Sequence, residues 1–188
     1  MADALDLLRT RRSVKVAQLA SPGPTEEETR TLLEIATRVP DHGKLAPWKF
    51  VLLREAGQKK LGNLCADIFM ALHKEEATEK HHAFEAARFT RAPLVVAVLS
   101  TPIRGRIPLW EQELSAGAAC MNMLHAAHAM GYAAQWLSEW PCYEEKVCEA
   151  LGGGKEDRIA GFVYIGTAAE NPDERDRPSF DDVVSDWG

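Results

Sequence analysis

The sequence predicts one domain of mixed helices and strands arranged around a single sheet. The chain has 188 residues, a length that suits one domain better than two. Hydrophobic residues make up 46% and charged residues 27%, which is enough apolar material for a packed core and argues against disorder. Helical and strand-like patterns follow one another along residues 1–188, without an internal repeat, a low-complexity tract or a linker.

Apolar side chains at three- and four-residue spacing predict five helices. Thr25 and Glu28 form a capping-box pattern at the start of the second helix, and Gly131 is placed to cap the long fourth helix. Gly152-Gly153-Gly154 ends the short fifth helix, which Pro141 and Glu144 open. The other four helices are expected over 4–10, 25–40, 61–72 and 109–130.

Short apolar segments predict four strands, over 48–53, 94–100, 132–137 and 159–165. The second of these has no polar alternation, so we expect it to be buried on both faces. The charged stretch from Lys74 to His82 is interpreted as a solvated helix or loop rather than a mobile lid. The tail from Asn171 is polar, contains Pro172 and Pro178, and is expected to wrap over the surface or over a partner subunit.

Charge and composition exclude several classes of protein. The net charge of −6 argues against general binding to nucleic acid, which needs a basic surface. The longest apolar stretch, Pro93 to Leu99, is too short to span a bilayer, and Met1 to Asp6 carries acids where a signal peptide carries bases. The four cysteines form no CxxC pair and are interpreted as free thiols. We therefore expect a cytoplasmic protein without a membrane partner.

Several familiar motifs are absent or incomplete. The run Gly152 to Lys155 follows a helix and lacks the spacing of a phosphate loop, so a helix stop is the better interpretation. No GxGxxG follows a strand, and neither HExxH nor GxSxG occurs. His125 and His128 lie three residues apart on a helix, but no third ligand has a suitable spacing, so no metal site is expected.

The sequence Arg11-Arg12-Ser13 at the end of the first helix is the strongest candidate for a ligand site. Two guanidinium groups and a hydroxyl supply the donors that a phosphate monoester accepts. Basic residues are also common at helix C-termini for electrostatic reasons, so this motif needs support from other segments.

Other segments supply that support, because in order along the chain they resemble the nitroreductase family. The opening LDLLRTRRS resembles the family's helix that ends in Arg-x-Ser, and RVPDHGKLAPW resembles its loop before Pro-Trp. WEQELSAG and GYAAQWLS are similar to the central helix and the segment after it, and DRPSFDDVVSDW is similar to the C-terminal ending. The resemblance covers nearly the whole chain and is strongest to the short, single-domain branch of NAD(P)H nitroreductases.

The resemblance implies an α+β fold with a central, mostly antiparallel sheet flanked by helices. It implies a homodimer in which the C-terminal tail wraps the partner and two chains share each FMN site. Carried over by position, Arg11, Arg12 and Ser13 would hold the phosphate and ribityl chain. Arg38 and His42 would come from the other subunit, and the remaining FMN-binding positions would lie along the ribityl chain or the isoalloxazine ring: Trp136, Leu137 and Ser138.

Two segments depart from the family pattern. Lys44 and Ala46 stand where many relatives have Asn or Gln in the loop before Pro-Trp. Leu137 stands where the short branch often has Arg, so a contact from this residue would come from its backbone.

The resemblance also implies a mechanism in which the flavin carries the chemistry and no protein nucleophile is needed. NAD(P)H, a transient co-substrate, would deliver a hydride to the flavin, leave, and be replaced by a small acceptor such as a nitroaromatic or a quinone. In this ping-pong cycle the protein stabilises negative charge on the N1–C2=O edge of the reduced ring. Lys15, two residues after Ser13, is the candidate for that electrostatic role, and an exposed lysine is the alternative.

Three alternatives remain at this point. The same fold could carry another flavin reaction, such as reductive dehalogenation or flavin fragmentation. The protein could bind flavin without enzymatic activity, or it could be an α/β binding domain without a cofactor.

Overall fold

The computed structural model describes residues 3–170 and 172–188. Its centre is an antiparallel five-stranded sheet in the order β1-β5-β3-β2, with β4 also pairing with β5. Residues 162–166 of β5 pair with Ala133 to Leu137 of β4 along one edge of β5, and β3 pairs along its other edge. The strands are β1 (Leu19–Ala20), β2 (Trp48–Leu53), β3 (Leu94–Ser100), β4 (Ala133–Leu137) and β5 (Arg158–Ala168). The predicted α+β fold is confirmed.

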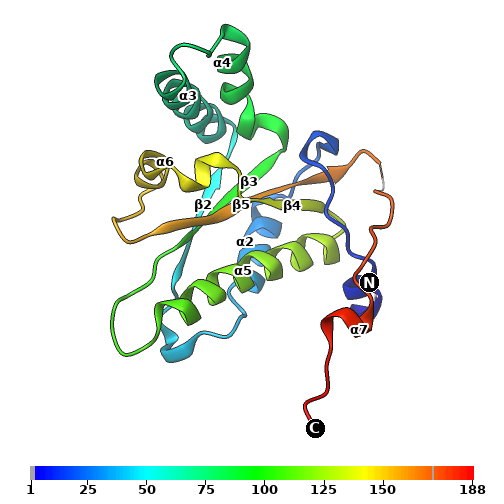
Figure 1. Cartoon of the computed structure of the whole chain (residues 1–188). Coiled ribbons are helices and arrows are strands. Elements are labelled where there is room, and N and C mark those ends of the chain that lie inside the picture. Colours follow the sequence, from blue (N-terminus) through cyan, green and yellow to red (C-terminus); the bar gives the residue numbers. More distant parts are fainter. Residues whose placement is uncertain (1–2, 171) are drawn as a thin grey trace.

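Helices cover both faces of the sheet (Figure 1). One face carries α2 (Glu26–Ala36) and α5 (Leu109–Ala129), and the other carries α3 (Glu55–Leu72) and α6 (Glu145–Ala150). All seven residues of β3 are buried, because Leu94, Val96 and Val98 enter one core while the alternate residues enter the other. A strand between two cores needs apolar residues at every position, which is why its sequence shows no alternation.

Local sequence signals set three of the helix ends. In α2 the Thr25 hydroxyl accepts the Glu28 N–H and the Glu28 carboxylate accepts the Thr25 N–H, which confirms the capping box. Gly131 at φ 85° and Gly152 at φ 80° end α5 and α6 in the left-handed region that favours glycine.

The second helix was expected to continue to Pro40, but it ends at Ala36, four residues earlier. The Asn122 amide of α5 donates to the carbonyl oxygens of Ile35 at 2.6 Å and Arg38 at 3.3 Å. These bonds satisfy two carbonyl groups at the end of the helix, which therefore need no further helical turn. Helical geometry is also disfavoured at Val39, because this residue precedes a proline.

Several short elements lie outside the predicted set. The helix α4 (Glu79–Ala86) starts within the charged Lys74 to His82 stretch and packs beside α3 at one end of the molecule, as Figure 1 shows. The helix α1 (Ala4–Thr10) was predicted. The other unpredicted helical elements are α7 (Phe180–Val183) and the 3-10 turns η1 (Val16–Gln18), η2 (His42–Lys44), η3 (Arg88–Arg91) and η4 (Trp140–Tyr143). Within the described ranges, no helix combines the length and hydropathy needed to cross a membrane.

Candidate functional site

The predicted phosphate-binding segment is held in an extended form along the edge of β4. After α1 ends, the Val14 N–H donates to the Ala134 carbonyl at 3.3 Å. The Val16 N–H then donates to the Gln135 side-chain oxygen at 2.8 Å. These bonds fix the backbone on both sides of Ser13, so Arg11, Arg12 and Ser13 occupy a defined place at the end of the sheet.

Arg11 and Arg12 form a concentration of positive charge at this end of the sheet. A terminal nitrogen of Arg11, Nη1, is buried and has no hydrogen-bond partner among the described residues. Burial lowers the pKa of Arg11, and the nearby charges of Arg177 and Arg12 lower it further. An unpaired buried donor surrounded by like charges is the environment that a phosphate dianion would relieve, so these residues fit the predicted FMN phosphate.

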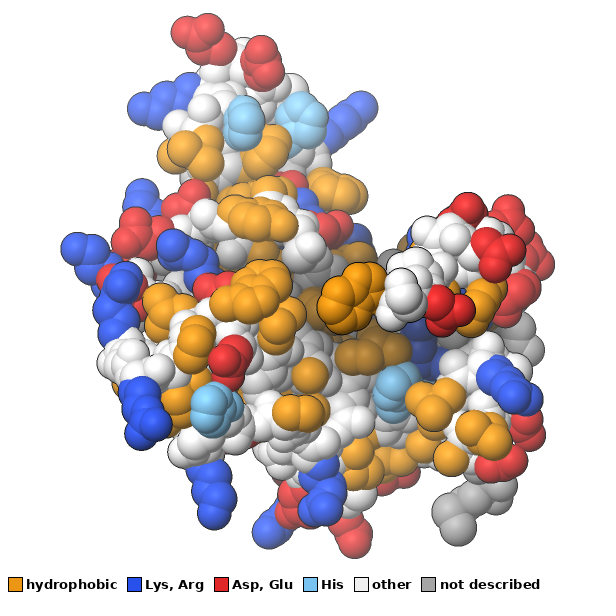
Figure 2. Space-filling view, turned by 60° about the horizontal axis from the view of Figure 1, so that its bottom comes forward, with side chains coloured by type: hydrophobic (Ala, Val, Ile, Leu, Met, Phe, Trp, Pro, Cys, Tyr) orange, Lys and Arg blue, Asp and Glu red, His pale blue; other side chains and the backbone are white. Residues whose placement is uncertain are grey.

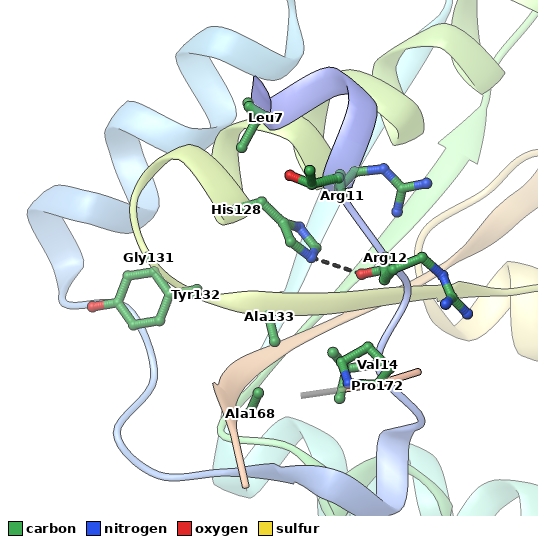
Figure 3. A pocket seen from close by; sticks show the side chains of 11 residues that line it. Leu7, Arg11, Arg12, Val14, His128, Gly131, Tyr132, Ala133, Ala168 and Pro172 are labelled. Carbon is green, nitrogen blue, oxygen red and sulfur yellow. Dashed lines mark hydrogen bonds between the residues drawn. The ribbon is translucent and has the colours of Figure 1, made fainter. Parts of the chain in front are cut away.

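Two hollows meet at this segment. One, of about 360 Å³, is lined by Arg11, Arg12, His128 and Tyr132 and is drawn in Figure 3. The other, of about 710 Å³, is lined by Arg12, Ser13, Lys15 and Gln135 on one side and by the C-terminal tail on the other. Lys15 is exposed at the wall of the larger hollow, so its ammonium group can reach a ligand there.

The C-terminal tail adds a cation that the sequence analysis did not identify. Glu174 lies 3.9 Å from Arg12 and 3.2 Å from Arg177, and Arg12 also donates to the backbone carbonyl of Asp173. The tail thus brings Arg177 to the Arg11 and Arg12 cluster from more than 160 residues away in sequence. The sequence does show Arg177 as a basic residue within an acidic tail. Only the fold shows that this tail lies beside Arg11 and Arg12.

The end of β4 and the residue after it, positions 136–138, place their three side chains in different environments. The Trp136 indole donates from Nε1 to the Ala160 carbonyl at 3.0 Å and remains 36% exposed. The Leu137 side chain packs against the core on the α3 side, so it leaves only its backbone for a ligand. Ser138 is exposed. Gly161 makes room for the indole, because a Cβ there would lie 2.0 Å from Trp136 Nε1.

A buried ion network anchors the chain directly after this segment. Arg88 is 5% exposed and pairs with Glu85 through two 2.7 Å bonds and with Glu139 through a third. Arg91 adds a 3.1 Å bond to Glu139. Because Glu139 follows Ser138, this network ties the 136–138 segment to η3 and α4.

The second predicted half of the site, the loop before Pro47, lies elsewhere. The loop has an unusual backbone, with Gly43, Lys44 and Ala46 at φ 76°, 56° and 47°. The Asp41 carboxylate stabilises it by accepting the N–H groups of Leu45 and Ala46. Non-glycine residues in this region cost free energy, and such strain is concentrated at functional sites.

One chain does not bring the two halves together. His42 contacts Glu111 at the start of α5, at 2.7 Å, whereas the Arg12 backbone contacts His128 at the end of α5. At 1.5 Å per residue, these two contacts are separated by about 25 Å along the helix. Arg38 lies between them, since its carbonyl contacts Asn122.

The four cysteines and the two histidines of α5 are the remaining candidates. All four cysteines are free and buried, and burial raises the pKa of Cys65, Cys120 and Cys142 to about 12. The described residues contain no group of three or more side chains that could hold a metal ion. His125 and His128 therefore need another explanation.

Comparison with known proteins agrees with this geometry. The nitroreductase family pattern matches residues 8–167. The Escherichia coli protein named "Putative NAD(P)H nitroreductase YdjA" is 36% identical over 168 residues, 88% of each chain. A Haemophilus influenzae "Putative NAD(P)H nitroreductase" is 35% identical over 179 residues, 93% of this chain and 94% of the relative.

Solved structures show the same fold. A nitroreductase-like family protein from Bacillus cereus superimposes with a TM-score of 0.84 at 23% identity, covering 100% of this chain and 97% of that one. A Bacteroides fragilis nitroreductase with bound FMN gives 0.73 at 18% identity, with complete coverage of both chains. Because the family pattern spans most of the sequence and the relatives match along its length, the chain belongs to the nitroreductase family.

Proposed function

We propose that this protein is an FMN-dependent oxidoreductase that uses NAD(P)H to reduce a small acceptor, such as a nitroaromatic or a quinone. The observation that carries the proposal is the unpaired, buried Nη1 of Arg11 beside Arg12 and Ser13. The names of the relatives and the FMN bound by a structural neighbour support it. When bound, FMN supplies the hydride chemistry and passes electrons from NAD(P)H to the acceptor in a ping-pong cycle.

Each part of the site has a distinct task in this proposal. Arg11, Arg12 and Ser13 bind the phosphate, and Arg177 adds positive charge to the same cluster. Trp136, the Leu137 backbone and Ser138 line the ribityl chain or the ring. Lys15 tunes the charge at the reduced ring edge from the wall of the hollow.

The proposed enzyme is a homodimer with shared sites. His42 is too far along α5 from Arg12 to join it within one chain, so a second subunit supplies His42, together with Arg38 from the same segment. Exposed apolar side chains on α5 and in the C-terminal tail are available for the interface, and Figure 2 shows exposed hydrophobic side chains on the face turned toward the viewer. Trp110 and Leu114 are 67% and 54% exposed, and Phe180 and Trp187 are 73% and 103% exposed.

An affinity ratio tests the phosphate assignment. FMN and riboflavin are titrated against the wild type, Arg12→Gln and the matched control Arg9→Gln, which alters an exposed arginine in the last turn of α1. Loss of a charge-assisted contact costs about 1.5–3 kcal/mol, so Arg12→Gln should weaken FMN by about tenfold or more and leave riboflavin nearly unchanged. Equal affinities of the wild type for FMN and riboflavin would refute the assignment.

Activity and assembly are tested separately. The purified protein should show a flavin absorption spectrum and should oxidise NADH or NADPH when an acceptor is added. Leu114→Glu should dissociate the dimer and release flavin, whereas Leu72→Glu, a change at another exposed leucine, at the end of α3, should leave both unchanged. A flavin-loaded, active monomer in light scattering would contradict the shared site.

A further inference from the structure

His128 connects the end of α5 to the backbone of the phosphate-binding segment. Its Nδ1 lies 2.9 Å from the Leu124 carbonyl oxygen, and its Nε2 lies 2.8 Å from the Arg12 carbonyl oxygen. Figure 3 shows the ring pointing at the Arg12 carbonyl across the smaller hollow. Both ring nitrogens are therefore within hydrogen-bonding distance of groups that can only accept.

This geometry depends on how many protons the ring carries. A neutral imidazole has one N–H, so it can donate to only one of the two carbonyl oxygens and turns a lone pair toward the other. The imidazolium has two N–H groups and satisfies both. The negative end of α5 favours the charged form as well, because His128 lies in the last turn of that helix.

The surroundings oppose this charge in the ligand-free protein. Burial lowers the pKa of His128, and the nearby Arg11 guanidinium lowers it further, against the effect of the two carbonyl contacts. Several titratable groups surround the ring. His125 lies one turn earlier on α5, and Arg11 and Arg12 follow α1. Tyr132 lies at the pocket wall with its 2.9 Å partner Glu28 of α2, and Glu174 of the tail lies beside Arg12. Of these charged groups, Arg11 is the one whose charge lowers the pKa of His128.

A phosphate bound at Arg11, Arg12 and Ser13 shifts this balance toward the imidazolium, because it neutralises the Arg11 charge that lowers the pKa of His128. We propose that His128 takes up a proton when the phosphate of FMN binds, and that the imidazolium then holds the Arg12 backbone through both ring N–H groups. The proposal rests on the proposed function of the arginine cluster. It makes His128 a positioning residue, since it acts through Arg12 and does not itself contact the ligand.

The coupling is reciprocal. If phosphate binding favours protonation of His128, then protonation of His128 tightens phosphate binding by the same factor. FMN affinity should therefore rise as the pH falls toward 6, by at most about tenfold per pH unit for one proton. Riboflavin has no phosphate and should show no such dependence through His128.

Calorimetry in buffers of different ionisation enthalpy counts the protons taken up. FMN is titrated at pH 7 into the wild type, His128→Gln and the matched control His125→Gln, which alters a titratable neighbour of Arg11 one turn earlier in α5. The FMN phosphate, with a second pKa of about 6, exchanges protons itself, but this contribution cancels between variants. The wild type and His125→Gln should take up more protons than His128→Gln, and riboflavin should show no difference.

Distinct results separate the possible failures. Equal proton uptake by the wild type and His128→Gln would overturn the proposal while leaving FMN binding intact. If His128→Gln does not fold, the ¹⁵N shifts of the wild-type ring decide instead: FMN should convert one ring N–H into two, and an unchanged pattern overturns the coupling. A wild type that ignores FMN in an absorbance titration refutes the proposed function, and the coupling falls with it.

Discussion

Replacing Gly161 with alanine should displace the Trp136 indole and release the flavin ring without affecting phosphate recognition. A Cβ at this position would lie 2.0 Å from Nε1 and 2.4 Å from Cδ1 of Trp136, and 3.0 Å from the Leu137 carbonyl oxygen. The first two distances are far below van der Waals contact, so the indole must move by more than 1 Å, as a rough estimate. The third involves backbone, which cannot move without disturbing the pairing of β4 and β5.

The expected loss of stability follows from these contacts. Moving the indole breaks its hydrogen bond to the Ala160 carbonyl, worth about 1 kcal/mol. Overpacking against the Leu137 backbone adds about 1–3 kcal/mol. Alanine is also strained at φ 156°, the value that Gly161 adopts, and this strain outweighs any gain from restricting the unfolded chain. Gly161→Ala should therefore reduce the free energy of unfolding by about 2–4 kcal/mol.

Urea unfolding followed by circular dichroism measures the stability. Gly57→Ala in α3 is the matched control, because its Cβ would make an ordinary 3.8 Å contact with Leu53 and alanine favours a helix by about 0.8–1 kcal/mol. FMN and riboflavin should weaken together in Gly161→Ala, leaving their ratio unchanged. A variant as stable as the wild type, with both ligands bound normally, would refute the account of the 136–138 segment.

Three further predictions concern charge and protonation. Lys15→Met should retain FMN but lower its two-electron potential by tens of millivolts in a dye titration, since about 30 mV corresponds to 1.4 kcal/mol; equal potentials would show that Lys15 does not face the ring. The flavin-free protein should lose stability as the pH falls below 6.5, because the folded state lowers the pKa values of His125 and His128 and the unfolded chain then binds more protons. His128→Gln should therefore flatten the dependence of Tm on pH. A thiol reagent at pH 8 should react with the buried Cys65, Cys120 and Cys142 only after urea is added. Rapid labelling of these thiols in the native protein would contradict their burial.

The parts of the fold that the sequence predicted are those controlled by local chemistry. The uniform apolar run of β3 reflects its place between two cores, and the Thr25 capping box and the glycine stops act within a few residues. The Arg-Arg-Ser motif marked one end of the candidate site because all its donors are consecutive. In each case the signal and the structure it produces occupy the same short segment.

The parts that escaped prediction depend on contacts between distant segments. The two-residue strand β1 exists only because β5 offers an edge at Ala168. The pairing of Arg88 with Glu139 spans 51 residues, and the contact of His128 with Arg12 spans 116. Residues so far apart in the sequence show no spacing pattern. The sequence alone therefore does not reveal which charged residues form a buried network or which histidine contacts a distant backbone.

The shared FMN site is tested most directly by a mixed dimer. Arg12→Gln and His42→Ala chains carrying different affinity tags are coexpressed, and tandem purification isolates dimers with one chain of each kind. If each site takes Arg12 from one chain and His42 from the other, one of the two sites is intact. The mixed dimer should then hold about half the flavin and show about half the NAD(P)H oxidation of the wild type, well above either parent variant. A mixed dimer no more active or flavin-loaded than its parents would contradict the shared site.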